Sequence, residues 1–188
     1  KGDPIVVDTD EHPRASTTLE GLAKLKPVVT AEGTVTAGNA SGINDGAAAV
    51  LIASEQAIEE YQLKPRAKII ASTAVGIEPR IMGFAPAPAI KKLLKQANLT
   101  LEQMDVIELN EAFAAQALAV TRDLGLADDT TQVNPNGGAI AIGHPLGASG
   151  ARLVTTALNQ LEQTGGTYAL CSMCIGVGQG IAMIIQRV

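Results

Sequence analysis

Aromatic residues are scarce in this sequence: tryptophan is absent, and only two tyrosines and two phenylalanines occur among 188 residues. Hydrophobic residues still make up 46% of the chain, so a core has to be built mainly from Ala, Val, Ile and Leu. The 19 glycines favour tight packing between layers and close approach of a ligand to the backbone. The length suits one large domain, or one domain with appended segments.

Basic clusters, long apolar runs and a cysteine framework are missing as well. The formal net charge is −5 and no basic run is present, so neither nucleic acid nor a membrane surface is an expected partner. No apolar stretch approaches the roughly 20 residues of a membrane span, and no signal-peptide pattern opens the chain. Two cysteines without a disulfide pattern fit a reducing compartment, which predicts a cytoplasmic location.

From residue 66 onward, strand and helix patterns alternate regularly. The predicted strands are residues 67–75, 106–109, 168–172 and 180–187. The predicted helices are residues 88–97, 111–124 and 146–164, and Thr100 with Gln103 forms a capping box between two of these segments. This alternation predicts a layered α/β domain with helices on both faces of a sheet.

The first third of the chain is less regular. The capping-box pattern of residues 17–20 predicts a short helix that ends before Pro27. Residues 46–53 are predicted to form a buried strand, and Ser54 is predicted to cap a helix that runs to Tyr61. The chain opens without Met, in what reads as a strand at residues 5–7, so we expect it to be the later part of a longer protein.

One of only two histidines, His144, stands in a run of glycines and small residues from 136 to 150. Its neighbours restrict the backbone at the expected start of a helix, where free N–H groups can bind an anion or a polarised oxygen. Histidine also exchanges protons near neutral pH, so we predict a functional role over a merely structural one. His12 lies in a charged segment, and we predict that it is only solvated.

Cys171 and Cys174 form a C-x-x-C pair, which can indicate a redox couple or half of a zinc site. No second pair completes a zinc set, and the motif ends a strand, whereas a thioredoxin-like motif opens a helix. Residues three apart on a strand also face opposite sides. We therefore predict that Cys171 is a core residue, that Cys174 points into a cleft where it can exchange protons, and that no metal is bound.

Asn110 and Glu111 follow the predicted strand at residues 106–109. Ligands usually bind at the carboxyl ends of strands in α/β sheets. Spacing alone, however, favours Asn110 as the cap of the next helix.

Taken in this order, these sites resemble the thiolase family. The matching segments are residues 36–48, 110–114, 137–150 and 174–180. The resemblance implies a five-layer α-β-α-β-α sandwich of two similar halves, with a loop domain that contacts coenzyme A. It places the end of the loop domain at residues 1–39, a returning strand and helix of the N-terminal half at 40–65, and the C-terminal domain at 66–188. The nucleophilic cysteine of the family belongs to the N-terminal half, outside this chain.

The resemblance also implies a chemistry, because thiolases exchange acyl groups between coenzyme A thioesters through an acyl-cysteine. His144 would deprotonate the nucleophile and help to bind a thioester oxygen. Cys174 would take or give the proton at the carbon α to a thioester. Asn110 would hold a water of one oxyanion hole, and the N–H of Gly176 would serve a second hole.

Four further residues are implied in binding coenzyme A. Ser41, Phe113, Met82 and Phe84 would line the path of the pantetheine arm. Phe84 stands where smaller residues are common in the family, so it could shape the acyl pocket. Val177 also departs from the family, since many thiolases have glycine at this place in the turn.

Residues 168–182, with segments 10–14 and 133–138, look most like thiolases that cleave 3-oxoadipyl-CoA to succinyl-CoA and acetyl-CoA in aromatic-compound degradation. The alternative is an acetoacetyl-CoA or broad 3-ketoacyl-CoA thiolase. Two other interpretations are a non-catalytic acyl-CoA or lipid carrier and a ketosynthase of the same fold. The expected partners are coenzyme A, acyl-CoA, the N-terminal half of the same polypeptide and further copies in a homodimer or homotetramer. No bound cofactor is expected, and this chain alone is expected to be inactive.

Overall fold

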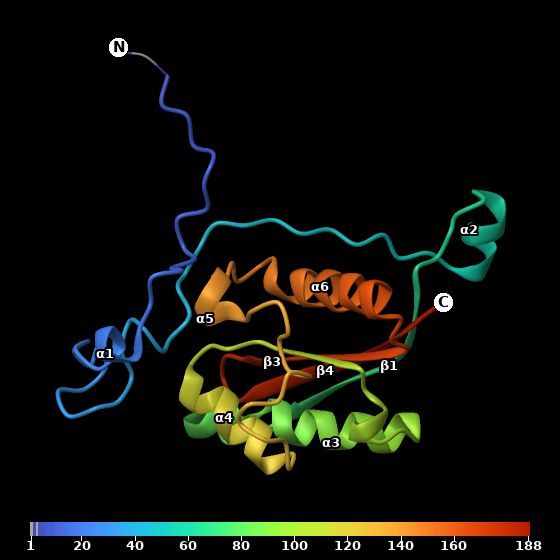
Figure 1. Cartoon of the computed structure of the whole chain (residues 1–188). Helices are drawn as coiled ribbons and strands as arrows, with labels where there is room; N and C mark the ends of the chain where they lie inside the picture. Colours follow the sequence, from blue (N-terminus) through green and yellow to red (C-terminus); the bar gives the residue numbers. More distant parts are fainter. Residues whose placement is uncertain (1, 3) are drawn as a thin grey trace.

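The computed structural model describes residue 2 and residues 4–188. A mixed four-stranded sheet with the strand order β1-β4-β3-β2 forms its centre (Figure 1). The strands are β1 (Ala67–Gly76), β2 (Val106–Leu109), β3 (Tyr168–Ile175) and β4 (Gln179–Arg187). β4 pairs antiparallel with both β1 and β3, whereas β2 and β3 are parallel. The carboxyl ends of β2 and β3 therefore meet at one edge of the sheet.

Helices cover both faces of this sheet (Figure 1). On one face, α3 (Pro86–Ala97) packs against β1 and β4, and α4 (Ala114–Asp123) lies beside α3. On the other face, α6 (Ser149–Thr164) packs against β2 and β3. The prediction of a layered α/β fold is confirmed.

Residues of β2 contribute alternately to two hydrophobic clusters. Ile107 and Leu109 pack with Ile90 and Leu93 of α3, while Val106 packs with residues of α6. Because successive strand residues point to opposite faces, β2 is buried on both sides. Its one charged residue, Glu108, is completely buried on the α6 side.

The sequence predicted the four strands and the three longer helices of residues 66–188 in the right order, but it missed the short helices at residues 79–84 and 139–142. The starts of the three longer helices were also wrong. α3 begins at Pro86, two residues before the expected Pro88, with a proline at the first helical position. α4 begins at Ala114, where Asn39 of a distant segment accepts a hydrogen bond from the Ala114 N–H. α6 begins at Ser149 because Pro145 and the next residues form a turn first.

Short elements complete the chain. α1 (Leu19–Leu22) is capped by Thr18, one residue after the cap that the pattern predicted, and α2 (Glu55–Glu60) is capped by Ser54 as predicted. The capping box at Thr100 is confirmed at the short helix η2 (Leu101–Gln103). The remaining short helices are η1 (Pro79–Phe84) and α5 (Ala139–Ile142). In the part of the chain that the structure describes, no helix is long and apolar enough to cross a membrane.

The predicted strand at residues 46–53 is wrong. This segment runs to α2 apart from the sheet (Figure 1), and within the described residues it pairs with no strand. Leu51 remains 81% exposed and Ile52 68% exposed. Residues 5–7 are likewise exposed and form no strand. An apolar run indicates burial, but a strand also needs a hydrogen-bonded neighbour, and no part of the described chain supplies one. The domain boundaries at residues 39/40 and 65/66 stay a prediction.

Candidate active site

The candidate site lies at the shared carboxyl edge of β2 and β3, where ligands bind in many α/β sheets. Asn110 directly follows β2, and its N–H donates to the carbonyl of Ser172 at 2.9 Å. Cys174 lies two residues further along β3, paired with Gly180 of β4. Sequence reasoning chose these two residues from separate motifs, and the sheet brings them to the same edge.

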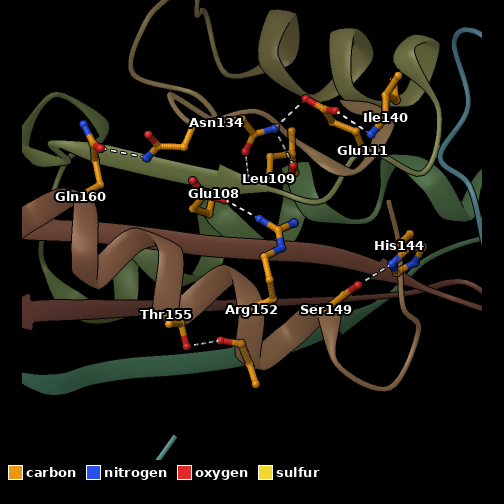
Figure 2. A network of polar contacts seen from close by, with 12 residues as sticks. Glu108, Leu109, Glu111, Asn134, Ile140, His144, Ser149, Arg152, Thr155 and Gln160 are labelled. Atoms are coloured by element: carbon orange, nitrogen blue, oxygen red, sulfur yellow. Dashed lines mark hydrogen bonds and ion pairs between the residues drawn. The ribbon is translucent and has the colours of Figure 1, made fainter. Parts of the chain in front are cut away.

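One assignment of protons satisfies all the hydrogen bonds around the His144 ring at once. The hydroxyl of Ser149 donates to the carbonyl of Pro145 at 3.0 Å, so its oxygen is free to accept from Nδ1 of His144 at 2.6 Å (Figure 2). In this assignment Nδ1 carries the proton of the neutral ring. Nε2 then bears the lone pair, and the Asn110 amide Nδ2 donates toward it at 3.4 Å. Nε2 is thus the basic atom, and it faces Asn110.

The backbone of His144 is held by a segment 100 residues away. Its N–H donates to the carbonyl of Gly42 at 3.0 Å and to Oδ1 of Asn44 at 3.2 Å. The ring of His12 extends this contact, with Nδ1 at 3.2 Å from Nδ2 of Asn44 and Nε2 at 3.1 Å from the carbonyl of Ile140. The prediction that His12 is only solvated is wrong, because these partners come from segments that sequence spacing does not connect.

Burial and charge tune the two ionisable groups of the site. Burial lowers the pKa of His144, and the nearby Arg152 guanidinium lowers this pKa further. The imidazole is therefore neutral at neutral pH and can accept a proton. Burial raises the pKa of Cys174, so its thiol holds a proton that it can donate. The two groups are set up as a base and an acid.

Asn110 does not cap the next helix, so the interpretation from spacing alone is wrong. The residue that precedes α4 is Phe113, and no side chain caps this helix. Asn110 is fully buried, and its amide nitrogen points at His144. Its Oδ1 has no hydrogen-bond partner among the described residues.

A buried ion pair beside the site was not foreseen. Arg152 of α6 donates from Nη1 to Oε2 of Glu108 at 3.0 Å (Figure 2). Burial raises the pKa of Glu108 to about 7, and the Arg152 charge limits the rise. No sequence pattern indicated this pair, because Glu108 reads as one polar residue in a strand and Arg152 as one polar residue of a helix.

A second unforeseen network fastens the glycine-rich run to the sheet (Figure 2). The side chain of Asn134 accepts from the N–H of Leu109 and donates to its carbonyl, both at 2.8 Å. Nδ2 of Asn134 also donates to Glu111 at 2.7 Å, and the other oxygen of Glu111 accepts from the N–H of Ile140 at 3.2 Å. The segment that leads to His144 is thereby fixed to the end of β2.

Two of the predicted coenzyme A residues lie side by side. The N–H and hydroxyl of Ser41 both donate to the carbonyl of Ala112, at 3.0 and 3.3 Å, and Ala40 pairs with Phe113. The other two, Met82 and Phe84, belong to η1, which packs against α4 and β3. Phe84 is partly buried against the hydrophobic cluster under α3. The roles of these four residues in binding stay predictions.

The turn between β3 and β4 contains the predicted second oxyanion donor. Gly176 is exposed in this turn, and a Cβ added there would meet no atom within 4 Å. Val177 has a φ of 62°, a left-handed conformation that is rare for a β-branched residue. Its side chain is 81% exposed, so no packing within the described residues compensates for this strain. The departure from glycine at this position therefore carries a conformational cost.

Both cysteines are free and buried, and Cys171 packs in the cluster under α6. The described residues contain no group of three or more His, Cys, Asp or Glu side chains that could hold a metal ion.

Comparisons with known proteins show the family of the chain. Residues 63–187 match the family model described as the thiolase C-terminal domain, and residues 1–56 match the thiolase N-terminal domain. A beta-ketoadipyl-CoA thiolase of Acinetobacter baylyi is 87% identical over all 188 residues, and an acetyl-CoA acetyltransferase of Syntrophomonas wolfei is 53% identical over 99% of the chain.

Among solved structures, human mitochondrial 3-ketoacyl-CoA thiolase in complex with CoA aligns over 97% of the chain and 46% of its own length, with a TM-score of 0.89 and 52% identity. The chain spans 47% of the Acinetobacter relative and 46% of the Syntrophomonas relative. Sequence and fold agree, and the chain belongs to the thiolase family.

Proposed function

We propose that this chain contributes the C-terminal half of the active site of a thiolase, an acyltransferase that exchanges acyl groups between coenzyme A thioesters. The observation that carries the proposal is the directional hydrogen-bond chain through His144, which leaves Nε2 as a base beside a buried amide donor. A protein that only binds acyl-CoA has no use for a base in a defined tautomer. The nucleophilic cysteine would come from the part of the longer protein that this chain does not span.

The proposed reaction uses the groups in turn. Nε2 of His144 takes the proton of the nucleophilic thiol, and the thiolate attacks the 3-oxo carbon of the substrate. The 3-oxo oxygen that becomes negative is stabilised by the N–H of Gly176 in the second oxyanion hole. When the carbon–carbon bond breaks, the oxygen of the leaving thioester is stabilised by the protonated Nε2 of His144 and by a water held on Asn110. Cys174 gives its proton to the α-carbon of that thioester. The Cys174 thiolate then takes the thiol proton of coenzyme A, whose sulfur attacks the acyl carbon while the N–H of Gly176 stabilises the acyl oxygen. The released nucleophilic cysteine regains its proton from His144.

For the substrate, we propose 3-oxoadipyl-CoA, which would be cleaved to succinyl-CoA and acetyl-CoA. The support is the 87% identity to a protein named beta-ketoadipyl-CoA thiolase. The alternative is an acetoacetyl-CoA or broad 3-ketoacyl-CoA thiolase, since an acetyl-CoA acetyltransferase is 53% identical. The catalytic motifs are shared, so only the acyl pocket separates the two.

The remaining proposals concern binding and setting. Ser41, Phe113, Met82 and Phe84 would line the pantetheine path, and the full-length protein would be a cytoplasmic homodimer or homotetramer without a bound cofactor. The free thiols of Cys171 and Cys174 support a reducing compartment.

The test is thiolysis by the full-length protein with 3-oxoadipyl-CoA and acetoacetyl-CoA as competing substrates. His144→Ala and Cys174→Ala are each expected to lower kcat by about 100- to 10,000-fold, the usual contribution of a general base or acid. Coenzyme A binding should survive in both variants. Unchanged turnover would exclude the catalytic roles and favour an acyl-CoA carrier. Residues 1–188 alone are expected to be inactive, and thiolysis by this piece would contradict the missing nucleophile.

A further inference from the structure

Three buried polar atoms near His144 have no hydrogen-bond partner among the residues that the structure describes. They are Oε1 of Glu108, Nη2 of Arg152 and Oδ1 of Asn110. A buried donor or acceptor that is left unpaired has lost its hydration without compensation, so three such atoms on neighbouring residues call for an explanation. The set contains one donor and two acceptors, which a small polar group could satisfy together.

Glu108 and Asn110 face the same side of the sheet. Ile107 and Leu109, the residues that alternate with them, pack in the cluster under α3. Glu108 and Asn110 therefore point toward α6. At a rise of about 3.3 Å per residue, their Cα atoms lie about 7 Å apart along the chain. A planar guanidinium with one further small molecule can span such a distance.

Arg152 approaches this face from α6, three residues after Ser149. Ser149 already contacts His144, which in turn contacts Asn110. One helical turn further on, Nη1 of Arg152 donates to Glu108, and the Arg152 side chain is only 17% exposed. Because the guanidinium is rigid, this contact also fixes the direction of Nη2.

We propose that Glu108 and Arg152 form a positioning pair that orients the Asn110 amide through one buried water molecule. The water accepts from Nη2 of Arg152 and donates to Oδ1 of Asn110 and to Oε1 of Glu108, so that all three atoms gain a partner. It lies on the opposite side of the amide from the water proposed for the oxyanion hole. The inference rests on the proposed function, because it gives Asn110 a catalytic task.

The orientation matters because the two ends of an amide have nearly the same shape. Packing alone cannot distinguish Asn110 from its flipped form, whereas a charged donor on one side can. With Oδ1 held toward Arg152, Nδ2 faces Nε2 of His144 and the reaction site. In the flipped form Oδ1 would face the lone pair of Nε2, and the oxyanion hole would lose its donor.

The direct test is a crystal structure of the full-length protein at a resolution that defines ordered waters. The expected result is one water within hydrogen-bonding distance of Arg152 Nη2, Asn110 Oδ1 and Glu108 Oε1. The absence of a water from this position, or an Asn110 amide with its oxygen toward His144, would overturn the proposal.

The kinetic test replaces the ion pair with apolar residues in the full-length protein. Such a replacement is often neutral or stabilising, so Glu108→Leu with Arg152→Met should fold with a similar thermal midpoint. The expected loss in kcat is about 10- to 100-fold, with KM for coenzyme A within about twofold, because part of the oxyanion donor is lost. In the Asn110→Ala background, the same double change should lower kcat by less than about twofold, since the coupled residue is gone. Arg122→Gln, which breaks an exposed ion pair with Asp128, is the matched control.

An equal loss of kcat in both backgrounds, or full activity of the double variant, would overturn the proposal. If the double variant does not fold, the crystal structure of the unmodified protein still decides. An unmodified protein without thiolase activity would refute the proposed function, while the position of the water would still be tested on its own.

Discussion

The hydroxyl of Ser149 offers a direct test of the tautomer assigned to His144. Ser149 is fully buried, and its oxygen accepts from Nδ1 of His144 at 2.6 Å. In Ser149→Ala, the Nδ1–H group loses this partner. The tautomer with the proton on Nε2 then becomes more stable, because Nδ1 no longer has an acceptor. With a proton on Nε2, His144 can no longer act as a base toward the nucleophile.

The size of the effect follows from the unpaired donor. A buried N–H group without an acceptor costs about 1–3 kcal/mol. If this cost falls on the productive tautomer, kcat/KM for thiolysis by the full-length protein should decrease by about 5- to 150-fold. KM for coenzyme A should change little, because Ser149 is buried beside the histidine ring.

A matched control lies on the same helix. The hydroxyl of Thr155 donates to the carbonyl of Ala151 at 2.9 Å, the same spacing as Ser149 to Pro145, but it contacts no histidine (Figure 2). Thr155→Val removes this hydroxyl and should leave kcat/KM unchanged. If Ser149→Ala stays within twofold of the unmodified protein, or if Thr155→Val loses as much activity, the tautomer argument is wrong.

Three further predictions concern stability, read as thermal or denaturant unfolding of the full-length protein. Val177→Gly should raise stability by about 0.5–1 kcal/mol, because the strain of a β-branched residue in the left-handed conformation exceeds the entropy cost of glycine. A lower stability of this variant would contradict the strain at Val177. Gly180→Ala should lower stability by about 1–3 kcal/mol, since its Cβ would lie 2.5 Å from the backbone oxygen of Ala85. Gly147→Ala is the control, because a Cβ added at Gly147 would meet no atom within 4 Å. Because the folded state lowers the pKa of His144, stability should fall as pH drops below the unfolded value of about 6.5. His144→Gln should not show this loss of stability at acidic pH. If stability depends on pH in the same way in the variant and in the unmodified protein, the assignment to His144 is wrong.

The regular part of the fold was predictable from the sequence because its signals are local. The helix over Pro86–Ala97 buries Ile90 and Leu93 at helical spacing. The strand at Val106–Leu109 is a short segment with three apolar residues out of four. Caps such as Ser54 and Thr100 act within four residues, so they too were readable. Each of these features is decided by residues that are close in sequence.

The errors have one physical cause. Residues 46–53 have the composition of a buried strand, but strand formation depends on a partner that no local pattern supplies. His12 reads as a solvated residue, yet it contacts Ile140, which is 128 residues away. Asn110 reads as a helix cap, but the sheet turns its side chain toward His144.

The sequence by itself determined which residues carry reactive groups and in what order they occur: Asn110, His144 and Cys174, each at the end of a predicted element. Only the tertiary structure decided which nitrogen of His144 bears the lone pair and which buried groups surround the ring. Ser149 assigns the proton to Nδ1, and the pair of Glu108 and Arg152 lies between β2 and α6. A tautomer and a buried ion pair depend on the distances and directions between side chains of different elements. Those distances exist only after the helices have packed on the sheet.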